Sequence, residues 1–244
     1  MSENKHANLR LTASLLPIIA PFIAKADIRY YLNAINVRPH KDGGAVICAT
    51  NGHALGAIHD KDAACEHEVI LRFDTRMQQA CAGGRKNERS VVMIGGRLAV
   101  VEESGIEVCI QAGNPEIEAN YPRYERVIPK LETLQPGLLG MYGAPIILLA
   151  EKAAAAAAKM KGKSLRGHAG LQFFNVQGQK ESSAVFRIAI APDFVGVMMP
   201  MRDDYGMPAA PAWVASLPPV DDLASMTATA ASASAPVEEA GVPA

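Results

Sequence analysis

The feature that most constrains the fold of this chain is an order of predicted elements that repeats along the sequence. A short strand, a helix and three strands follow one another, and the same order then occurs twice more. The period is roughly 60–70 residues, which is typical of a duplicated supersecondary unit. The repeats share negligible sequence identity, so element order alone indicates the duplication. We therefore predict an α+β fold in which antiparallel sheets carry helices on one face.

The first repeat is predicted from two hydrophobic patterns. Apolar residues recur at helical spacing over Leu15–Ile23. Pro17 fits a first helical turn, whereas Pro21 should kink or end the helix. Short apolar and β-branched runs, separated by turn residues, predict the strands. These strands are expected at Leu9–Leu11, Arg29–Val37, Ala45–Thr50 and His53–Ile58.

The second and third repeats follow the same order. Asp74 is the expected N-cap of the second helix, and Pro145 opens a third helix that contains the alanine run Ala153–Ala158. The strands of the second repeat are expected at Glu68–Phe73, Val91–Ile94, Leu98–Glu102 and Ile106–Gln111. Those of the third are expected at Leu138–Tyr142, Leu171–Val176, Ala184–Ile190 and Val195–Met199.

Composition limits the class of protein. Apolar residues make up 49% of the chain and charged residues 20%, as in ordinary globular proteins. No apolar run approaches the roughly 20 residues that cross a bilayer, which excludes a membrane span. Lys5 and Arg10 precede an apolar segment, Leu11–Ala24, in the manner of a secretory signal, but Glu3 lies in the basic part and Pro17 and Pro21 interrupt the apolar part. We therefore expect this segment to be part of the fold and the protein to be cytoplasmic.

A search for catalytic motifs finds none in the sequence. The G-x-S-x-G motif is absent, and Lys161–Ser164 is not a phosphate loop because Ala157 replaces the first glycine. His53 and His59 share a face at strand spacing, and Cys65 and His67 lie nearby. No carboxylate or second Cys completes a metal site there. The cysteines form no C-x-x-C pair, which favours small buried hydrophobes over a zinc site or disulfides. They are Cys48, Cys65, Cys81 and Cys109. We expect no enzyme activity, metal or cofactor.

The net charge of −1 conceals an uneven distribution. Residues 203–244 carry six acidic and no Lys or Arg side chains, so 24 basic and 19 acidic residues give the rest a charge of +5. The Ala- and Pro-rich composition of residues 203–244 predicts a disordered tail. A basic cluster on and after the third helix is either a solvated face or a sequence-independent surface for DNA phosphates. It consists of Lys152, Lys159, Lys161, Lys163 and Arg166.

Three regions of sequence together resemble one known family. They are Asp27–Asn33 with Ala49–Leu55, then Tyr121–Lys130, and finally Val197–Arg202. In order, these are similar to D-V/I-R-Y-Y-L-N with A-T-D-G-H-R-L, to F-P-D-Y-R-R-V-L-P-K, and to V-V-M-P-M-R. Those motifs belong to the bacterial replicative sliding clamp, the beta subunit of DNA polymerase III. The resemblance spans most of residues 8–202.

The resemblance implies a non-enzymatic ring that encircles duplex DNA without sequence specificity. It also implies a pocket that tethers DNA polymerase, or other proteins, by their clamp-binding peptides. The matching positions combine apolar walls with a few polar groups, which suits short peptides with apolar anchors. They are Leu32, Thr50, Gly52, His53, Leu55, Pro122, Arg126, Val127, Val197 and Met199. Arg126 is expected at the rim. The chain departs from the family's motif at Asn51, which replaces Asp, and at Ala54, whose replacement of an Arg should widen the groove and alter its peptide preference.

Length is the larger departure from the family, whose chains have three domains of two repeats each. Residues 1–130 resemble a complete middle domain, residues 131–202 resemble the second half of the last domain, and the first domain is missing. Two clamp chains supply twelve repeats to their ring. Two copies of this chain supply six, and four copies supply twelve if a half-domain is completed across a subunit boundary.

Two functions therefore remain open. The first is a reduced clamp that encloses DNA as a homo-oligomer and acts as a processivity factor in DNA replication. The second is a non-encircling peptide-binding module that sequesters or modulates clamp-binding proteins. An unrelated α+β enzyme has less support, because no catalytic motif accompanies it.

Overall fold

Three repeats of strand, helical segment and three strands are present in the computed structural model, which describes residues 8–82, 88–137, 140–164, 169–176 and 182–201. The first repeat (residues 10–60) comprises β1 (Arg10–Thr12), η1 (Ala13–Leu15), α1 (Leu16–Ile19), η2 (Ala20–Phe22), η3 (Tyr30–Asn33), β2 (Ile35–Pro39), β3 (Ala45–Thr50) and β4 (Ala54–Asp60). The second (residues 69–110) comprises β5 (Val69–Leu71), α2 (Thr75–Ala82), β6 (Arg89–Ile94), β7 (Arg97–Glu102) and β8 (Glu107–Ile110). The third (residues 134–198) comprises β9 (Leu134–Pro136), α3 (Ala144–Met160), β10 (Leu171–Val176), β11 (Ala184–Ile188) and β12 (Ala191–Met198).

A connector, residues 111–133, joins the second repeat to the third and contains η4 (Tyr124–Arg126) and η5 (Leu131–Thr133). The predicted tail, residues 203–244, lies outside the described residues.

The strands form two antiparallel sheets. One has the order β1-β6-β7-β8, and the other has the order β5-β2-β3-β4-β12-β11-β10-β9. The first two repeats exchange their first strands, since β1 pairs with β6 and β5 pairs with β2. The third repeat makes no such exchange, because β9 pairs with β10 of its own repeat. The α+β fold class predicted from the repeat is therefore confirmed.

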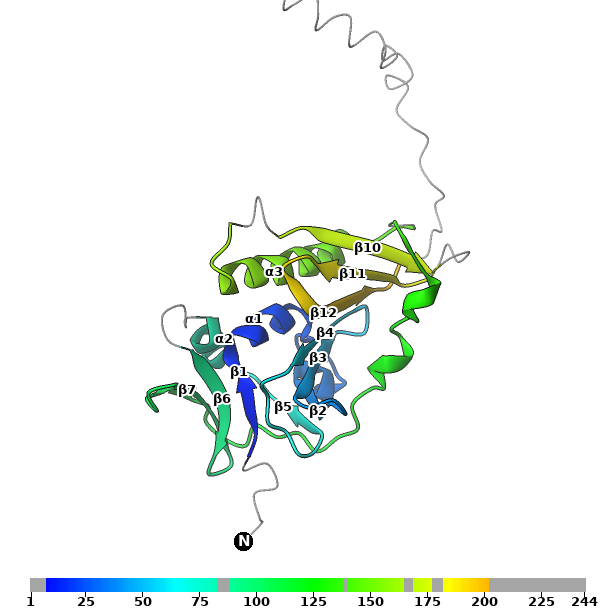
Figure 1. Ribbon diagram of the computed structural model, residues 1–244. Helices are drawn as coiled ribbons and strands as arrows, with labels where there is room; N and C mark the ends of the chain where they lie inside the picture. Colours follow the sequence, from blue (N-terminus) through cyan, green and yellow to red (C-terminus); the bar gives the residue numbers. More distant parts are fainter. Residues whose placement is uncertain (1–7, 83–87, 138–139, 165–168, 177–181, 202–244) are drawn as a thin grey trace, which may run out of the picture. The chain divides into compact units, whose positions relative to one another are not determined.

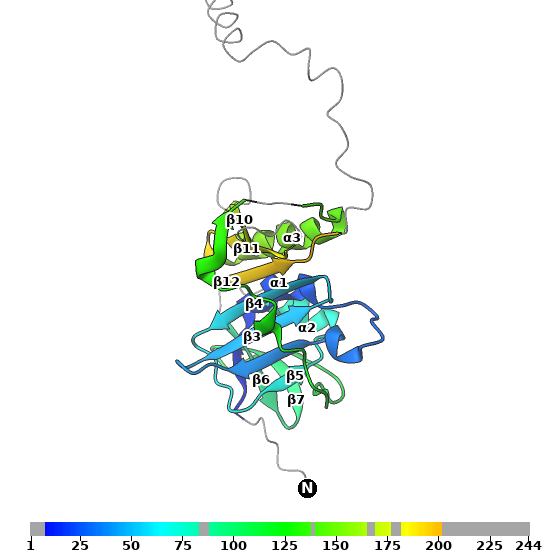
Figure 2. The same cartoon turned by 90° about the vertical axis from the view of Figure 1, so that its right-hand side faces the viewer.

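The helices lie between or beside these sheets (Figures 1 and 2). In Figure 1, α1 and α2 separate the four-stranded sheet from β2–β4, and α3 lies beside β11 and β12. The main hydrophobic core joins residues of all three helices to the inner faces of both sheets. A second, smaller core lies on the other face of the eight-stranded sheet, where the connector packs on it. The functional site described below lies in this second core.

The prolines divide the first helical segment as their chemistry requires. Pro17 occupies the first turn of α1, and Pro21 lies in η2, where the α-helix has already given way to a 3₁₀ turn. Leu16, Ile19 and Phe22 of the predicted apolar face are buried in the core, and Ile18, which was not part of that face, is buried as well. The expected single helix is therefore three short helical turns.

Two strand predictions were wrong in position. Arg29–Val37 begins with η3, because the Asn33 side chain donates to the Asp27 carbonyl at 2.9 Å and accepts the Asp27 N–H at 3.0 Å, which closes a loop. The strand starts only at Ile35. In the third repeat the first strand is β9 rather than Leu138–Tyr142, of which residues 138 and 139 lie outside the described residues. Met141 makes an isolated bridge to Met201.

The second and third helices agree with their predicted signals. The Asp74 carboxylate accepts the Met77 N–H at 2.8 Å, which caps the start of α2. In α3 the alanines Ala150, Ala153, Ala154 and Ala157 are buried. Their small side chains let α3 pack closely against α1, since the main core includes both helices. None of the described helices has the combination of length and apolar content that crossing a membrane requires.

A pair of glycines joins the first repeat to the third. β4 and β12 pair antiparallel, and Gly56 lies opposite Gly196. A Cβ at position 56 would come within 2.4 Å of the Phe22 ring, and one at 196 within 2.1 Å of the Phe186 ring. Phe194 completes the cluster, with ring centroids 6.1 Å from Phe22 and 5.6 Å from Phe186. Absent side chains on the strands therefore make room for aromatic rings that bind the two repeats together.

The cysteines are all free thiols, but only Cys48 and Cys81 are buried, whereas Cys65 and Cys109 are half-buried. Burial raises the pKa of the Cys81 thiol to about 12 and that of the Cys65 thiol to about 11. Both are therefore protonated and unreactive at neutral pH.

Candidate functional site

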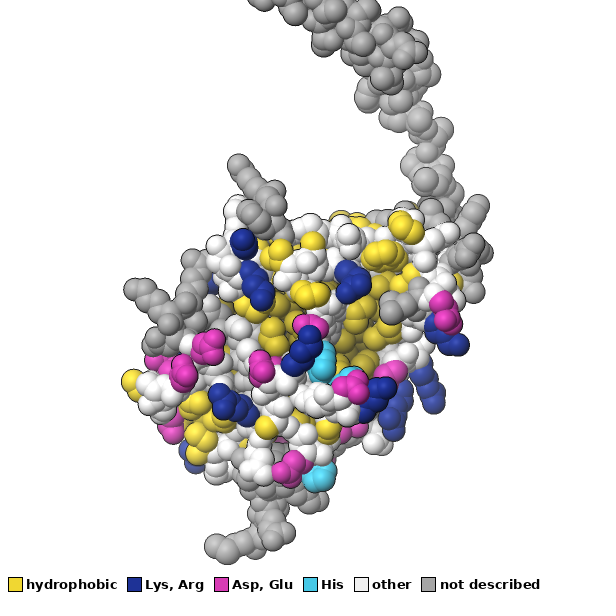
Figure 3. Space-filling model, viewed as in Figure 1, with side chains coloured by type: hydrophobic (Ala, Val, Ile, Leu, Met, Phe, Trp, Pro, Cys, Tyr) yellow, Lys and Arg dark blue, Asp and Glu magenta, His cyan; other side chains and the backbone are white. Residues whose placement is uncertain are grey.

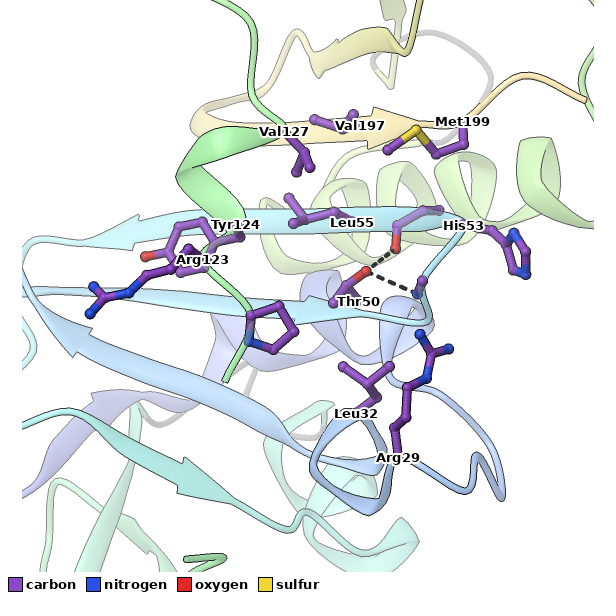
Figure 4. A pocket seen from close by; sticks show the side chains of 13 residues that line it. Arg29, Leu32, Thr50, His53, Leu55, Arg123, Tyr124, Val127, Val197 and Met199 are labelled. Atoms are coloured by element: carbon purple, nitrogen blue, oxygen red, sulfur yellow. Dashed lines mark hydrogen bonds between the residues drawn. The ribbon is translucent and has the colours of Figure 1, made fainter. Parts of the chain in front are cut away.

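The turn between β3 and β4 is held by its own side chains (Figure 4). The Asn51 side-chain oxygen accepts the N–H groups of His53 and Ala54 at 2.9 and 2.8 Å. The Thr50 hydroxyl accepts the Gly52 N–H at 3.1 Å and donates to the Ala54 carbonyl at 2.8 Å. Gly52 has φ +87°, a conformation that favours glycine. Asn51 supplies the acceptor oxygen that an Asp would supply, so this departure leaves the turn intact.

A hollow of about 180 Å³ opens beside this turn, where the connector crosses from β4 to β12. Its floor is a cross-strand pair, since Leu55 of β4 lies directly opposite Val197 of β12. The Met199 N–H donates to the His53 carbonyl at 2.9 Å and extends this junction past the strand ends. The lining is mostly apolar. It consists of Arg29, Leu32, Thr50, Gly52, His53, Ala54, Leu55, Pro122, Arg123, Tyr124, Val127, Val197 and Met199.

The structure brings nine of the ten pocket positions taken from the resemblance around this one hollow. They come from β3, β4, η3, the connector and β12 with the residue that follows it, which are far apart in the chain. Arg126 is the exception. It lies exposed at the end of η4 and does not line the hollow, whereas Arg123, the residue before η4, does.

Besides Ala54, which was noted only as a departure from the motif, three lining residues were not predicted as site residues: Arg29, Arg123 and Tyr124. All three lie inside segments already singled out, Asp27–Asn33 and Tyr121–Lys130. The missing information was conformational. A 3₁₀ turn at η3 and another at η4 decide which side chains point inward, and neither turn has a distinctive sequence pattern.

Arg29 gives one side of the hollow a fixed positive group. Its guanidinium donates to both carboxylate oxygens of Asp27, with Nε–Oδ1 and Nη2–Oδ2 distances of 3.0 and 2.8 Å. These bonds lower the pKa of Asp27 to about 2. Gly52 leaves room for the guanidinium, since a Cβ there would lie 2.9 Å from Nη2. In Figure 4 the Arg29 side chain extends toward the Thr50–His53 turn.

Buried tyrosines support the opposite wall. The Tyr121 hydroxyl accepts the Thr50 N–H at 3.1 Å, and burial raises the pKa of Tyr121, so it stays neutral. Tyr124 lies beneath the Arg38 guanidinium, whose Cζ is 5.3 Å from the ring centroid. Arg38 in turn pairs with Glu125 and with Glu68, the latter at 2.8 Å. The wall is therefore anchored to β2 before any ligand arrives.

The hollow also lacks a long side chain where the family motif has Arg. Ala54 is 3% exposed and contributes only its methyl group to the lining. Two exposed arginines lie at the edge: Arg29, whose charge is balanced by Asp27, and Arg123. An apolar slot with two arginines at its margin suits an acidic peptide segment that carries apolar anchors.

The basic cluster lies on another part of the surface. Lys152, Lys159, Lys161 and Lys163 are all exposed on and after α3, and Arg166 lies outside the described residues. Lys152 shares a shallow depression with Lys25, between α3 and the other two helices. Figure 3 shows Lys and Arg side chains on the α3 side of the molecule with hydrophobic side chains between them. Within the described ranges, no group of His, Cys, Asp or Glu side chains is arranged to hold a metal ion.

Comparison with known proteins places this architecture among solved structures. No protein-family model matches the chain, and no curated protein matches it significantly. A Pseudomonas aeruginosa DNA polymerase sliding clamp is 18% identical, with a TM-score of 0.56, over 82% of this chain and 68% of that one. The same organism's DNA polymerase III subunit beta, bound to griselimycin, is 17% identical, with a TM-score of 0.56, over 83% and 67%. A Caulobacter crescentus beta sliding clamp is 16% identical, with a TM-score of 0.54, over 83% and 67%.

At these identities the comparison shows the fold. The chain has the fold of bacterial DNA polymerase III beta sliding clamps, and it spans about two thirds of their length. This agrees with a shortened form of that architecture, as the three sequence motifs predicted.

Proposed function

We propose that this chain, which has the sliding-clamp fold, is a non-enzymatic peptide-binding protein of DNA replication that tethers polymerase or other proteins. The observation that carries the proposal is the hollow at the β4–β12 junction. Nine residues chosen from sequence motifs alone surround it, and its floor is apolar. In this proposal residues 1–130 are a complete clamp-type domain and residues 131–202 are half of a second.

The size and chemistry of the hollow suit one or two large apolar side chains. Fully burying a Leu, Phe or Met side chain contributes about 1.5–3 kcal/mol. Two such anchors contribute about 3–6 kcal/mol, so with backbone hydrogen bonds and after the cost of association we expect a dissociation constant between about millimolar and micromolar. The arginines at the margin favour peptides with acidic residues next to the anchors.

A peptide titration tests this proposal. A fluorescent peptide with two apolar anchors and a flanking acidic residue is titrated with the full chain and with Met199→Ala. Removing the Met199 side chain from the lining should weaken binding about tenfold, equivalent to about 1.4 kcal/mol. Met201→Ala is the matched control, because Met201 is also exposed but does not line the hollow. Equal affinity of both variants and the parent chain would remove the pocket from the proposal.

A second pair of variants tests the charged margin. Arg123 lines the hollow and Arg126 does not, although both are exposed on the same segment. Arg123→Ala should weaken binding of the acidic peptide by a few fold, because an exposed charge contact contributes about 0.2–1 kcal/mol. Arg126→Ala should leave it unchanged. Griselimycin, which binds the Pseudomonas aeruginosa clamp, is a second probe for the same set of variants.

We further propose that the protein encircles duplex DNA as an oligomer. The exposed lysines of α3 support this proposal because they can contact phosphates. Phosphate contacts make affinity fall with salt, by about 0.9 in the log–log slope for each contact. The double variant Lys152→Glu, Lys159→Glu should reduce both the affinity for duplex DNA and that slope, whereas Lys130→Glu on the connector should not. Absence of DNA binding, combined with peptide binding, would instead favour the non-encircling module that modulates clamp-binding proteins.

A further inference from the structure

The edge of the four-stranded sheet at β8 differs from the edges at β1 and β5, and the fourth edge, β9, is only three residues long and ends in Pro136. At β1, the Arg10 N–H donates to the Ala64 carbonyl and the Ala64 N–H donates to the Arg10 carbonyl, both at 2.9 Å. At β5, the connector runs alongside, with Arg72 N–H to Pro115 O at 2.8 Å and Ile117 N–H to Ile70 O at 2.9 Å. These edges are covered by the chain itself. Among the described residues, β8 pairs with β7 only.

The uncovered edge is also apolar. Ile106, Val108 and Ile110 are 60%, 38% and 48% exposed, and Ile94 at the end of β6 is 44% exposed. An exposed edge strand offers unpaired N–H and C=O groups to another strand, and soluble proteins normally cover or charge such edges. Here the charge is limited to Glu107 within β8. The backbone groups and the side chains therefore both favour a β-strand partner with an apolar surface.

The molecule itself shows how two repeats join at such an edge. The last strand of the first repeat, β4, pairs antiparallel with the last strand of the third repeat, β12. In the second repeat the last strand is β8, which leaves it as the one last strand without such a partner among the described residues. Within the part of the chain that the structure describes, the only further last strand with a free edge is the β8 of another copy.

We infer that β8 is a self-association edge, at which two copies of this chain pair β8 with β8 antiparallel about a two-fold axis. The same surface is then used by both copies, as in other isologous dimers. Such pairing joins the two four-stranded sheets into one of eight strands, matching the strand count of the sheet formed by β4 and β12. Ile106, Val108 and Ile110 of the two copies then cover one another.

The inference rests on the proposed DNA encirclement, which requires more than one copy of the chain, but it does not depend on the peptide pocket, which lies on the other sheet. A dimer joined at β8 has the third repeat of each copy at its two ends. Each end carries the exposed residues Ile147 and Leu148 on α3. A ring built from such dimers therefore has to close through the third repeats, and not through β8.

Sedimentation velocity of the full chain over a range of micromolar concentrations tests the inference. The parent chain should shift from monomer to dimer as concentration rises, and Ile110→Lys should remain monomeric under the same conditions. Ile28→Lys is the matched control, because Ile28 is 96% exposed in the loop before η3. It should dimerise like the parent. Persistence of the dimer in Ile110→Lys, or its loss in Ile28→Lys, overturns the inference.

Hydrogen exchange on the unmodified chain gives a second readout that does not depend on a variant folding. Amide exchange within residues 106–110 should slow as concentration rises, while exchange in β10 and β11 should not change. A chain that is monomeric throughout, with exchange independent of concentration, contradicts the edge assignment. If that same monomer binds the peptide, the edge assignment fails and the peptide-binding proposal stands. If the chain dimerises through β8 but binds no peptide, the edge assignment stands and the peptide-binding proposal fails.

Discussion

The first two repeats and the third repeat are built from the same elements but are stabilised differently. The first two exchange β1 and β5, and they enclose α1 and α2 between two sheets. The third keeps its own first strand, β9, and its one helix packs against α1 of the first repeat. The third repeat therefore depends on the β4–β12 junction for its core. The candidate pocket lies at this junction, so peptide affinity should fall when the third repeat is destabilised.

The strongest test of this difference removes an aromatic ring from the junction. Phe186→Ala should cost about 3–5 kcal/mol of unfolding free energy, because a fully buried ring in the Phe22 and Phe194 cluster is lost. Hydrogen exchange under increasing urea should show β10–β12 opening before β6 and β7, together with loss of peptide binding.

Leu98→Ala supplies the comparison for that variant. Leu98 is fully buried in β7, and its truncation should cost about 2–5 kcal/mol. Here β6 and β7 should lose protection at least as early as β10–β12. Identical patterns of opening in the two variants would show that the regions do not differ in stability.

A smaller change crowds the junction instead of emptying it. Gly196→Ala places a Cβ 2.1 Å from the Phe186 ring, so the ring must shift, at a cost of about 1–3 kcal/mol. Thermal unfolding should show this loss, and peptide affinity should fall because Val197 is displaced with the strand. In the control Gly170→Ala, the new Cβ lies 3.9 Å from the Ala189 side chain, and stability should not fall. Equal behaviour of the two variants would rule out crowding as the cause.

A substitution at the capping residue of α2 tests the first two repeats, with an expected loss of stability similar to that of Gly196→Ala. Asp74→Ala removes the acceptor of the Met77 N–H and should cost about 1 kcal/mol. Because α2 lies in the second repeat, peptide affinity should not change, and Asp74→Asn should retain most of the stability. Weaker peptide binding by Asp74→Ala would mean that the pocket responds to the first two repeats as well.

The smallest expected effect concerns the charge pair beside the pocket. The folded pKa of Asp27 is about 2, below its usual value of 3.8, because of the Arg29 hydrogen bonds. The stabilisation is therefore fully present above the usual value and is lost as pH falls through about 2. An NMR titration of the Asp27 carboxyl should show this, and Asp27→Asn should change peptide affinity more than stability. A normal carboxyl titration in the folded chain contradicts the pairing.

The local elements could be predicted from sequence because their signals are local. The alanine run of α3, the Asp74 cap and the Asn51-Gly52 turn each specify their own geometry. The repeat order predicted the fold class for the same reason. The strand exchange had no local signal, since β1 and β5 are only three residues long and nothing in their sequences specifies a partner strand.

The candidate site was predictable only in part. Leu55 and Val197 were assigned from motifs, and their positions opposite each other in the ladder explain why both motifs are needed. The exchange of Arg126 for Arg123 was not predictable. It depends on how the connector packs on the eight-stranded sheet, where Tyr124 is buried beneath Arg38, a contact between distant parts of the chain.

The exchanged first strands have a consequence for how the chain responds to cleavage. A single protease cut between β4 and β5 would leave β1 and its partner β6 on different fragments, and likewise β5 and its partner β2. The hydrogen bonds between these strands would remain. Each fragment would still hold a strand in the other's sheet. The nicked protein should therefore migrate as one particle in native conditions and as two bands after denaturation.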